Sequence, residues 1–264
     1  MAGKLWVFDL DNTIRFCGSD YEKPAQDAAK YIHSLLKNDL GKKAPSTEEI
    51  ITVAREIDRK RVNEINPKTG TPFLYCMDRF PGSQVETFHQ LCQKYNINPG
   101  EAADSEIAGR LLKIGLRAFS EELFRSNIAP RAKEVLKFLR DQDDTLVIYT
   151  KGDNHVQNLK LKVLKKIGVI PQDTNACVQE NKHADTFRHL ALLYPSRKRF
   201  VVGDTYKADI QPALSLNLGY KSILIPAENW EEPGQLEKTL AEVDRQNCRI
   251  FKDLGQIVDQ YREL

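Results

Sequence analysis

The sequence has 264 residues, with 39 Lys and Arg against 37 Asp and Glu, and a formal net charge of +2. This near balance provides no overall field that would attract nucleic acid or an anionic membrane, so we expect neither as a partner. No segment reaches the ~20 consecutive apolar residues of a membrane span, and an apolar run begins at Leu5, which leaves no room for a signal peptide. The cysteines are scattered: Cys17, Cys76, Cys92, Cys177 and Cys248. Without a C-x-x-C spacing they are typical of reduced thiols, and we expect a soluble, cytoplasmic protein.

The order of the apolar runs predicts an α/β protein. Runs of strand length occur at 5–8, 145–149, 176–178, 199–202 and 222–225. Segments with helical periodicity lie between the later runs, so strand and helix alternate over the second half of the chain. Such alternation is typical of βαβ units, which build a Rossmann-like parallel sheet. The tail, 234–264, is predicted to contain a helix, a short strand near 248–251 and a terminal helix.

Residues 22–125 break this alternation. They are predicted to form helices over 24–37, 46–65, 81–95 and 101–125, separated by segments that contain Pro and Gly. Ser46-Thr47-Glu48-Glu49 resembles a capping box at the start of the second helix. We therefore predict an α/β core made of residues 1–21 and 126–264, with residues 22–125 inserted as a helical domain.

Two carboxylates follow the first apolar run. The segment 5–8 leads directly into Asp9-Leu10-Asp11, and side chains alternate along an extended chain, so Asp9 and Asp11 project the same way. Ligands bind at the carboxyl ends of strands in open α/β sheets. Two like charges this close repel each other, and a bound cation would relieve the repulsion. The alternative is an ordinary turn with an Asp-Asn helix cap.

A second group follows the run 145–149. Thr150, Lys151 and Gly152 come directly after this run. A hydroxyl at a strand end, followed by a glycine and a helix start, offers a phosphate one side-chain donor and backbone N–H groups. The alternative is a Thr/Asp cap of the next helix, with Asp153 as the capping residue.

Two further loops are expected at the same edge of the sheet. Asp204 and Asp209 follow the run 199–202, and hard oxygen ligands at this place suit Mg²⁺. The alternative is that Asp204 caps a helix and Asp209 is solvated. Lys182 stands at a predicted helix start, where a positive charge opposes the helix dipole, which suggests an anionic partner. The alternative is a solvated side chain, the usual state of a single lysine.

In this order, the four groups resemble the motifs of the haloacid dehalogenase-like (HAD) hydrolase superfamily. The matching segments are Asp9-Leu10-Asp11-Asn12-Thr13, Val147-Ile148-Tyr149-Thr150, Lys182-His183-Ala184-Asp185-Thr186-Phe187 (without the prolines usual in the family) and Gly203-Asp204 to Asp209. The resemblance covers the whole predicted core and implies the HAD fold. The insert resembles a C1-type helical cap, with Arg15 to Pro24 as the turn and flap that join core to cap. Lys151 or Lys162 is the alternative to Lys182 as the family's lysine.

The resemblance to the phosphatase branch implies an Mg²⁺-dependent phosphomonoester hydrolase. Asp9 would be the nucleophile that forms an aspartyl-phosphate, and Asp11 the acid that protonates the leaving group and then activates water. The implied metal ligands are Asp9, the Asp11 carbonyl, Asp204 and Asp209, the last through water. The implied phosphate-binding residues are Thr150 and Lys182, with Lys151 and Gly152.

The leaving group is expected to come from a small phosphorylated metabolite: a nucleotide, a phosphoglycolate-like acid or a sugar phosphate. Arg15, Tyr75 and Arg79 are candidate substrate contacts, although segment 73–80 is equally well explained as a packed interhelical loop. Three alternative functions stay open. A phosphomutase would keep all four motifs, a haloacid dehalogenase would need neither the metal nor Asp11, and a non-catalytic binding module would tolerate loss of a motif carboxylate. The oligomeric state is not predicted.

Overall fold

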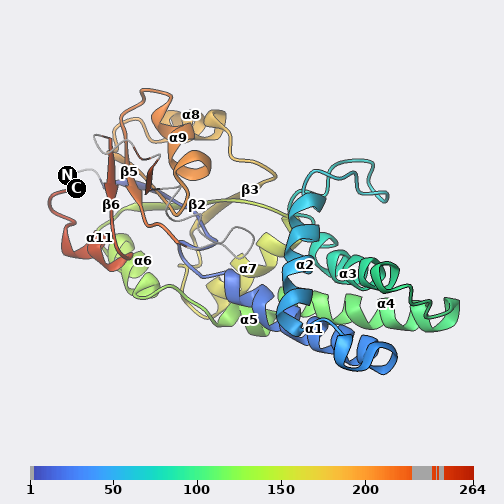
Figure 1. Ribbon diagram of the computed structural model, residues 1–264. Coiled ribbons are helices and arrows are strands. Elements are labelled where there is room, and N and C mark those ends of the chain that lie inside the picture. The colour runs from blue at the N-terminus through green and yellow to red at the C-terminus, as the bar shows by residue number, and fades with distance from the viewer. Residues whose placement is uncertain (1–2, 228–239, 242, 244–246) are drawn as a thin grey trace. The chain divides into compact units, whose positions relative to one another are not determined.

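A computed structural model describes residues 3–227, 240–241, 243 and 247–264 (Figure 1). Six strands form one parallel sheet in the order β3-β2-β1-β4-β5-β6. The strands are β1 (Leu5–Phe8), β2 (Thr145–Lys151), β3 (Asn175–Gln179), β4 (Arg199–Gly203), β5 (Tyr220–Leu224) and β6 (Cys248–Ile250). The predicted α/β class with a parallel sheet is confirmed. The helix expected from residue 234 falls largely outside the described residues.

Strand β1 lies at the centre of the sheet, where the strand order reverses. Its partner on one side is β2 and on the other β4, and Phe8 is level with Ile148 and Val202. These three strands therefore end close to one another. Such a reversal is the position at which open α/β sheets bind ligands, because the loops after the flanking strands separate there.

Helices cover both faces of the sheet. One face carries α6 (Ala132–Asp141), α7 (Asn154–Lys166) and α11 (Gly255–Asp259), and the other carries α8 (Ala184–Leu193) and the short α9 (Gln211–Leu214). Strand β1 supplies both cores through its alternation, since Trp6 and Phe8 pack with the first set and Leu5 and Val7 with the second. A fully buried β1 explains why its sequence is a continuous apolar run rather than an alternating one.

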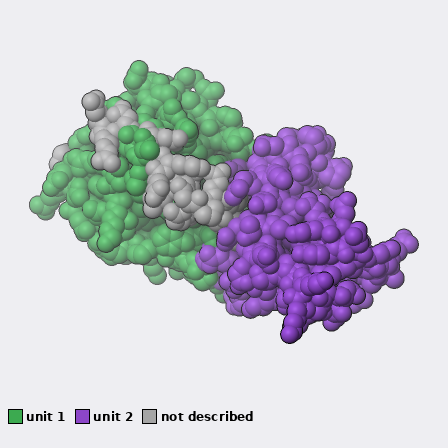
Figure 2. Space-filling view, viewed as in Figure 1, with its two compact units in different colours: residues 1–18, 124–264 green, residues 19–123 purple. Residues whose placement is uncertain are grey.

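The chain divides into two compact units, residues 1–18 with 124–264, and residues 19–123 (Figure 2). The helices of the second unit and its borders are α1 (Gly18–Leu40), α2 (Thr47–Arg61), α3 (Arg79–Tyr95), α4 (Glu101–Leu116) and α5 (Glu121–Arg125), with 3-10 turns at Gly41–Lys43 and Arg117–Phe119. The predicted capping box at the start of α2 is confirmed, with Glu49 N donating to Ser46 Oγ at 3.2 Å and Ser46 N to Glu49 Oε2 at 2.7 Å. Helices α3 and α4 pack closely because Gly115 has no side chain: a Cβ there would lie 2.6 Å from Pro81 Cα.

Two predicted boundaries were wrong. Helix α1 begins at Gly18 and contains Pro24, so residues 18–24 are helical and not part of a flap. Proline can lie in a helix because its ring holds φ near the helical value, although it removes one backbone donor. The predicted helix 101–125 is divided, because Ser120 adopts an extended backbone (φ −83°, ψ 146°). Within the described ranges, no helix is long and apolar enough to span a bilayer.

Candidate active site

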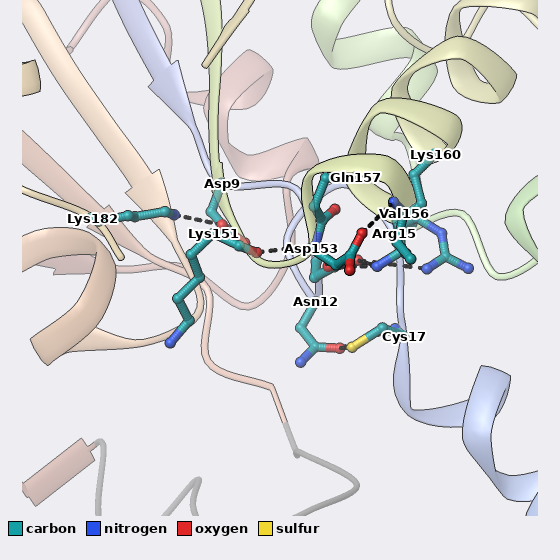
Figure 3. A network of polar contacts seen from close by, with 11 residues as sticks. Asp9, Asn12, Arg15, Cys17, Lys151, Asp153, Val156, Gln157, Lys160 and Lys182 are labelled. Atoms are coloured by element: carbon teal, nitrogen blue, oxygen red, sulfur yellow. Dashed lines mark hydrogen bonds and ion pairs between the residues drawn. The ribbon is translucent and has the colours of Figure 1, made fainter. Parts of the chain in front are cut away.

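Asp9 and Lys182 form the centre of the site. Asp9 directly follows β1, and its backbone N–H donates to the Val202 carbonyl of β4 at 2.8 Å. Lys182 lies just before α8, and its Nζ is 2.5 Å from Asp9 Oδ1 and 2.8 Å from Asp209 Oδ1. All three side chains are buried. The anionic partner expected for Lys182 is therefore a pair of carboxylates, of which Figure 3 shows Asp9.

Asp9, Asp204 and Asp209 form a carboxylate cluster. One oxygen from each lies within 4.8 Å of the others. Asp204 follows β4, and Asp209 lies in the single turn Tyr206–Ile210, which is π-helical. Thr205 N donates to Asp209 Oδ2 at 2.9 Å and so orients this carboxylate toward the strand end.

The electrostatics of the cluster fit a divalent cation. Burial raises the pKa of Asp9 to about 7, and repulsion from Asp209 adds to this effect against the opposing Lys182. Burial also raises the pKa of Asp204, and Asp209 and Asp9 add repulsion. Burial opposes the charge of Lys182, but its two carboxylates outweigh burial and raise its pKa. Three carboxylates thus surround one ammonium, and hard oxygen ligands with excess negative charge are what Mg²⁺ prefers.

Asp11 is held apart from this cluster by residues that the sequence analysis did not identify. Lys160 Nζ lies 2.9 Å from Asp11 Oδ1 and 2.7 Å from Oδ2, and Gln157 Nε2 donates to Oδ2 at 2.8 Å. Burial opposes the charge of Asp11, but Lys160 and Arg15 outweigh it and lower the pKa. The missed signal was a lysine on the apolar face of a helix, four residues after Val156 and four before Leu164.

The loop after β2 differs in part from the prediction. Thr150 and Lys151 belong to β2 itself, which is two residues longer than expected. Among the described residues, the buried Thr150 hydroxyl has no hydrogen-bond partner, so it could accept or donate to a ligand. The Gly152 N–H donates to the Gln179 carbonyl of β3 at 2.9 Å and not into the site. Asp153 caps α7, as the alternative interpretation held.

Tyr149 is a further residue to which the sequence analysis gave no role in the site. Its hydroxyl accepts from His183 N at 2.7 Å and donates to Gln179 Oε1 at 2.6 Å. Its ring centroid is 5.6 Å from Lys182 Nζ. The phenol therefore ties the segment that carries Lys182 to β2 and β3. The signal available in the sequence was a polar-ended aromatic residue within an otherwise aliphatic strand.

The candidate substrate residues lie in different environments. Arg15 is fully buried, with NH1 3.6 Å from Asp11 Oδ1. Arg79 is also buried, and its guanidinium contacts Asp58 Oδ2 at 3.1 Å and the Leu74 carbonyl at 2.5 Å. Arg79 therefore differs from an exposed substrate-binding arginine, because its positive charge is paired with Asp58 within the second unit. Tyr75 is 38% exposed.

Comparisons with known proteins identify the fold. No protein-family model matches the sequence, and no curated protein matches it. A haloacid dehalogenase-like family hydrolase from Xanthomonas campestris is similar in structure, with a TM-score of 0.62 and 18% identity over 99% of this chain and 96% of the other. The chain has the HAD fold. The HAD-hydrolase YfnB from Bacillus subtilis, whose structure was solved with bound magnesium, matches with a TM-score of 0.50 and 18% identity over 99% of this chain and 100% of YfnB.

Other proteins with this fold have different described activities. A predicted phosphoglycolate phosphatase from Haemophilus somnus matches with a TM-score of 0.52 and 18% identity over 99% of both chains. Haloacid dehalogenases also share the HAD fold. The fold alone therefore does not separate phosphate ester hydrolysis from dehalogenation.

Proposed function

We propose that this protein is an Mg²⁺-dependent phosphomonoester hydrolase with Asp9 as its nucleophile. The observation that carries the proposal is the presence of two kinds of carboxylate beside Asp9: the cluster with Asp204 and Asp209, and the separately held Asp11. The first suits a metal ion. The second is held as a carboxylate by Lys160 and Arg15, which is the form that takes a proton from water, and it has to be protonated to serve as the donor in the first displacement. A dehalogenase needs neither, since a halide leaves without a proton.

The residues divide the reaction into two displacements. Asp9 attacks phosphorus, and the bond from phosphorus to the ester oxygen breaks as Asp11 gives that oxygen a proton. Water then attacks the phosphorus of the aspartyl-phosphate and passes a proton to Asp11. The bond between phosphorus and the Asp9 oxygen breaks, so that phosphate leaves and the Asp9 carboxylate is restored. Lys182 and the Thr150 hydroxyl would bind phosphoryl oxygens.

The carboxylate cluster would hold the metal. Asp9, Asp204 and Asp209, with the Asp11 carbonyl, are the proposed ligands. Bound Mg²⁺ supplies charge neutralisation, which lets an anionic nucleophile approach an anionic ester. Lys182 contributes a second positive charge and favours the ionised form of Asp9 through their contact, against the effect of burial.

We further propose that residues 19–123 act as a cap that selects a small phosphorylated metabolite. They are inserted between Asp11 and Thr150 in the sequence. The proposed catalytic residues therefore belong to the first unit, and recognition of the leaving group would belong to the second. Tyr75, with its partly exposed ring, is the candidate contact in this unit. Tyr75→Ala should change the ranking of natural phosphate esters while changing hydrolysis of a small aryl phosphate much less. The five cysteines, all within the described residues, form no disulfide, which suits a reducing, cytoplasmic location.

Turnover of 4-nitrophenyl phosphate, with and without excess EDTA, tests the proposed function. We expect metal-dependent phosphate release that Asp9→Asn abolishes, because an amide is neither a nucleophile nor a charged ligand. Asp173→Asn is the control, since that side chain is largely exposed. Release of chloride from 2-chloropropionate, without phosphatase activity, would support a dehalogenase instead. Conversion of a sugar phosphate into its isomer by the protein, without net release of phosphate, would support a phosphomutase. An inactive protein that binds phosphate esters would support a binding module.

A further inference from the structure

Lys160 is a lysine on the buried face of α7. Only 4% of its side chain is exposed, and helix α7 buries Val156 and Leu164 one turn before and one turn after it. Burying an ammonium group costs several kcal/mol unless a partner of opposite charge offsets the cost. Asp11 is that partner, with both carboxylate oxygens within 2.9 Å of Nζ.

Gln157 holds the same carboxylate from the preceding turn of α7. Its Nε2 donates to Asp11 Oδ2 at 2.8 Å and to the Lys151 carbonyl at 3.0 Å, and it shares a helix face with Lys160 at the i, i+3 spacing. Gly152 leaves the room for this amide, since a Cβ there would lie 2.7 Å from Nε2. Helix α7 thus starts beside the site and points two donors at one carboxylate.

The surroundings of Lys160 restrict its movement. Phe124 is fully buried, with its ring centroid 5.7 Å from Lys160 Nζ and 5.3 Å from the Arg15 guanidinium carbon. Figure 3 shows Lys160, Gln157 and Arg15 gathered on one side, while Lys182 approaches Asp9 from the other. The Asp11 carboxylate is therefore oriented by the two side chains from α7, together with Arg15, and not by Lys182, which contacts Asp9.

We propose that Lys160 and Gln157 are positioning residues that fix the orientation of the Asp11 carboxyl for its proton transfers. This inference rests on the proposed function, in which Asp11 gives a proton to the ester oxygen and later takes one from water. Neither residue reacts; both act through Asp11. A displacement of about 1 Å in a reacting group can cost about 10²-fold in rate, so loss of either donor should slow steps that need the proton.

Two esters separate this role from a general structural one. 4-Nitrophenyl phosphate has a leaving group that departs without a proton, whereas the leaving group of glycerol phosphate needs one. We expect Lys160→Met to lower kcat/KM for glycerol phosphate by about 10²-fold or more, and for 4-nitrophenyl phosphate by less than about tenfold. With the aryl ester, kcat should fall and a burst of nitrophenolate should appear, because water attack still needs Asp11. Gln157→Leu should show the same pattern, and Lys166→Met, at an exposed site on α7, should match the unaltered protein.

A double variant completes the test. If Lys160 acts through Asp11, adding Lys160→Met to Asp11→Asn should cause little further loss, since the carboxyl to be positioned is already gone. Equal losses on the two esters in both Lys160→Met and Gln157→Leu, or an additive loss in the double variant, would overturn the inference alone. An unaltered protein that releases phosphate from neither ester would overturn the proposed function and this inference with it.

Discussion

Gly203 and Asp209 are in closer contact than any residue with a side chain at 203 would allow. A Cβ on Gly203 would lie 2.3 Å from Asp209 Cβ and 2.7 Å from its Oδ2. The absence of a side chain at the end of β4 therefore lets the Tyr206–Ile210 turn bring Asp209 against the strand, beside Asp9 and Lys182.

Gly203→Ala should displace Asp209 and weaken Mg²⁺ binding. A ligand at 100 times its Kd stabilises a protein by about 2.7 kcal/mol, and we expect Gly203→Ala to lose most of this magnesium-dependent stabilisation in thermal melts. Gly109→Ala is the matched control, because it lies in α4 with open space around its Cβ. That variant should be as stable as the unaltered protein or slightly more so, with an unchanged response to Mg²⁺. An unchanged response in Gly203→Ala would mean that Asp209 is not a ligand.

Lys182→Met should destabilise the protein more in EDTA than in Mg²⁺. Removing the ammonium leaves Asp9 and Asp209 buried without their positive partner, and breaking a buried ion pair typically costs about 3–5 kcal/mol. A bound cation would restore part of the lost attraction. Urea unfolding with EDTA or with Mg²⁺ measures both effects, and Lys166→Met serves as the exposed-lysine control. Equal destabilisation in both conditions would argue against a cation at this cluster.

Arg79→Met should destabilise the second unit. The Arg79 guanidinium contacts the buried Asp58 at 3.1 Å, and Ser83 donates to the other oxygen of that carboxylate at 3.0 Å. Loss of the arginine leaves a buried charge with one neutral donor among these contacts, at a cost of about 3–5 kcal/mol. Arg117→Met removes the exposed pair with Asp27 in the same unit and should cost no more than about 1 kcal/mol. Chemical denaturation of both variants makes the comparison. A stable Arg79→Met variant with altered substrate ranking would return Arg79 to the role of a substrate contact.

Two tyrosines should make the core sensitive to alkali. Burial raises the pKa of Tyr220 to about 12, and burial together with the Asp144 carboxylate also raises the pKa of Tyr261. Each phenol is harder to ionise in the folded chain than in the unfolded one. Their stabilising contribution is thus complete below the ordinary tyrosine pKa of about 10 and is lost as the pH rises through the folded value.

The free energy of unfolding, measured between pH 9 and pH 12, should therefore decline. Tyr261→Phe should make that decline shallower, because the phenol that donates to Asp144 Oδ2 at 2.9 Å is gone. The same variant should be less stable at neutral pH by about 1 kcal/mol, the value of one hydrogen bond. Identical pH profiles for the two proteins would show that this phenol does not titrate in the measured range.

The sequence by itself determined the core of the fold and predicted the sheet edge at which the candidate site lies. The apolar runs that became β1, β2 and β4 were readable because strands buried on both faces are continuously apolar. Parallel strands bring their carboxyl ends to one edge, so the residues that follow them were expected together before any contact was known. The capping box at Ser46 was equally local, because its two hydrogen bonds join residues three apart.

The tertiary structure decided which charges meet. Lys182 and Asp9 are 173 positions apart, and Lys160 and Asp11 are 149 apart, so no local pattern relates either pair. The pairing of Lys160 with Asp11 depends on the rotation of α7 about its axis against the sheet. The packing of the apolar side chains of α7 sets this rotation. The hydrogen-bond partner of the Gly152 N–H likewise comes from a distant segment, because β3 supplies the Gln179 carbonyl that accepts it. Local propensity acts over a few residues, whereas the partner of a buried charge is chosen by the packing of the whole core.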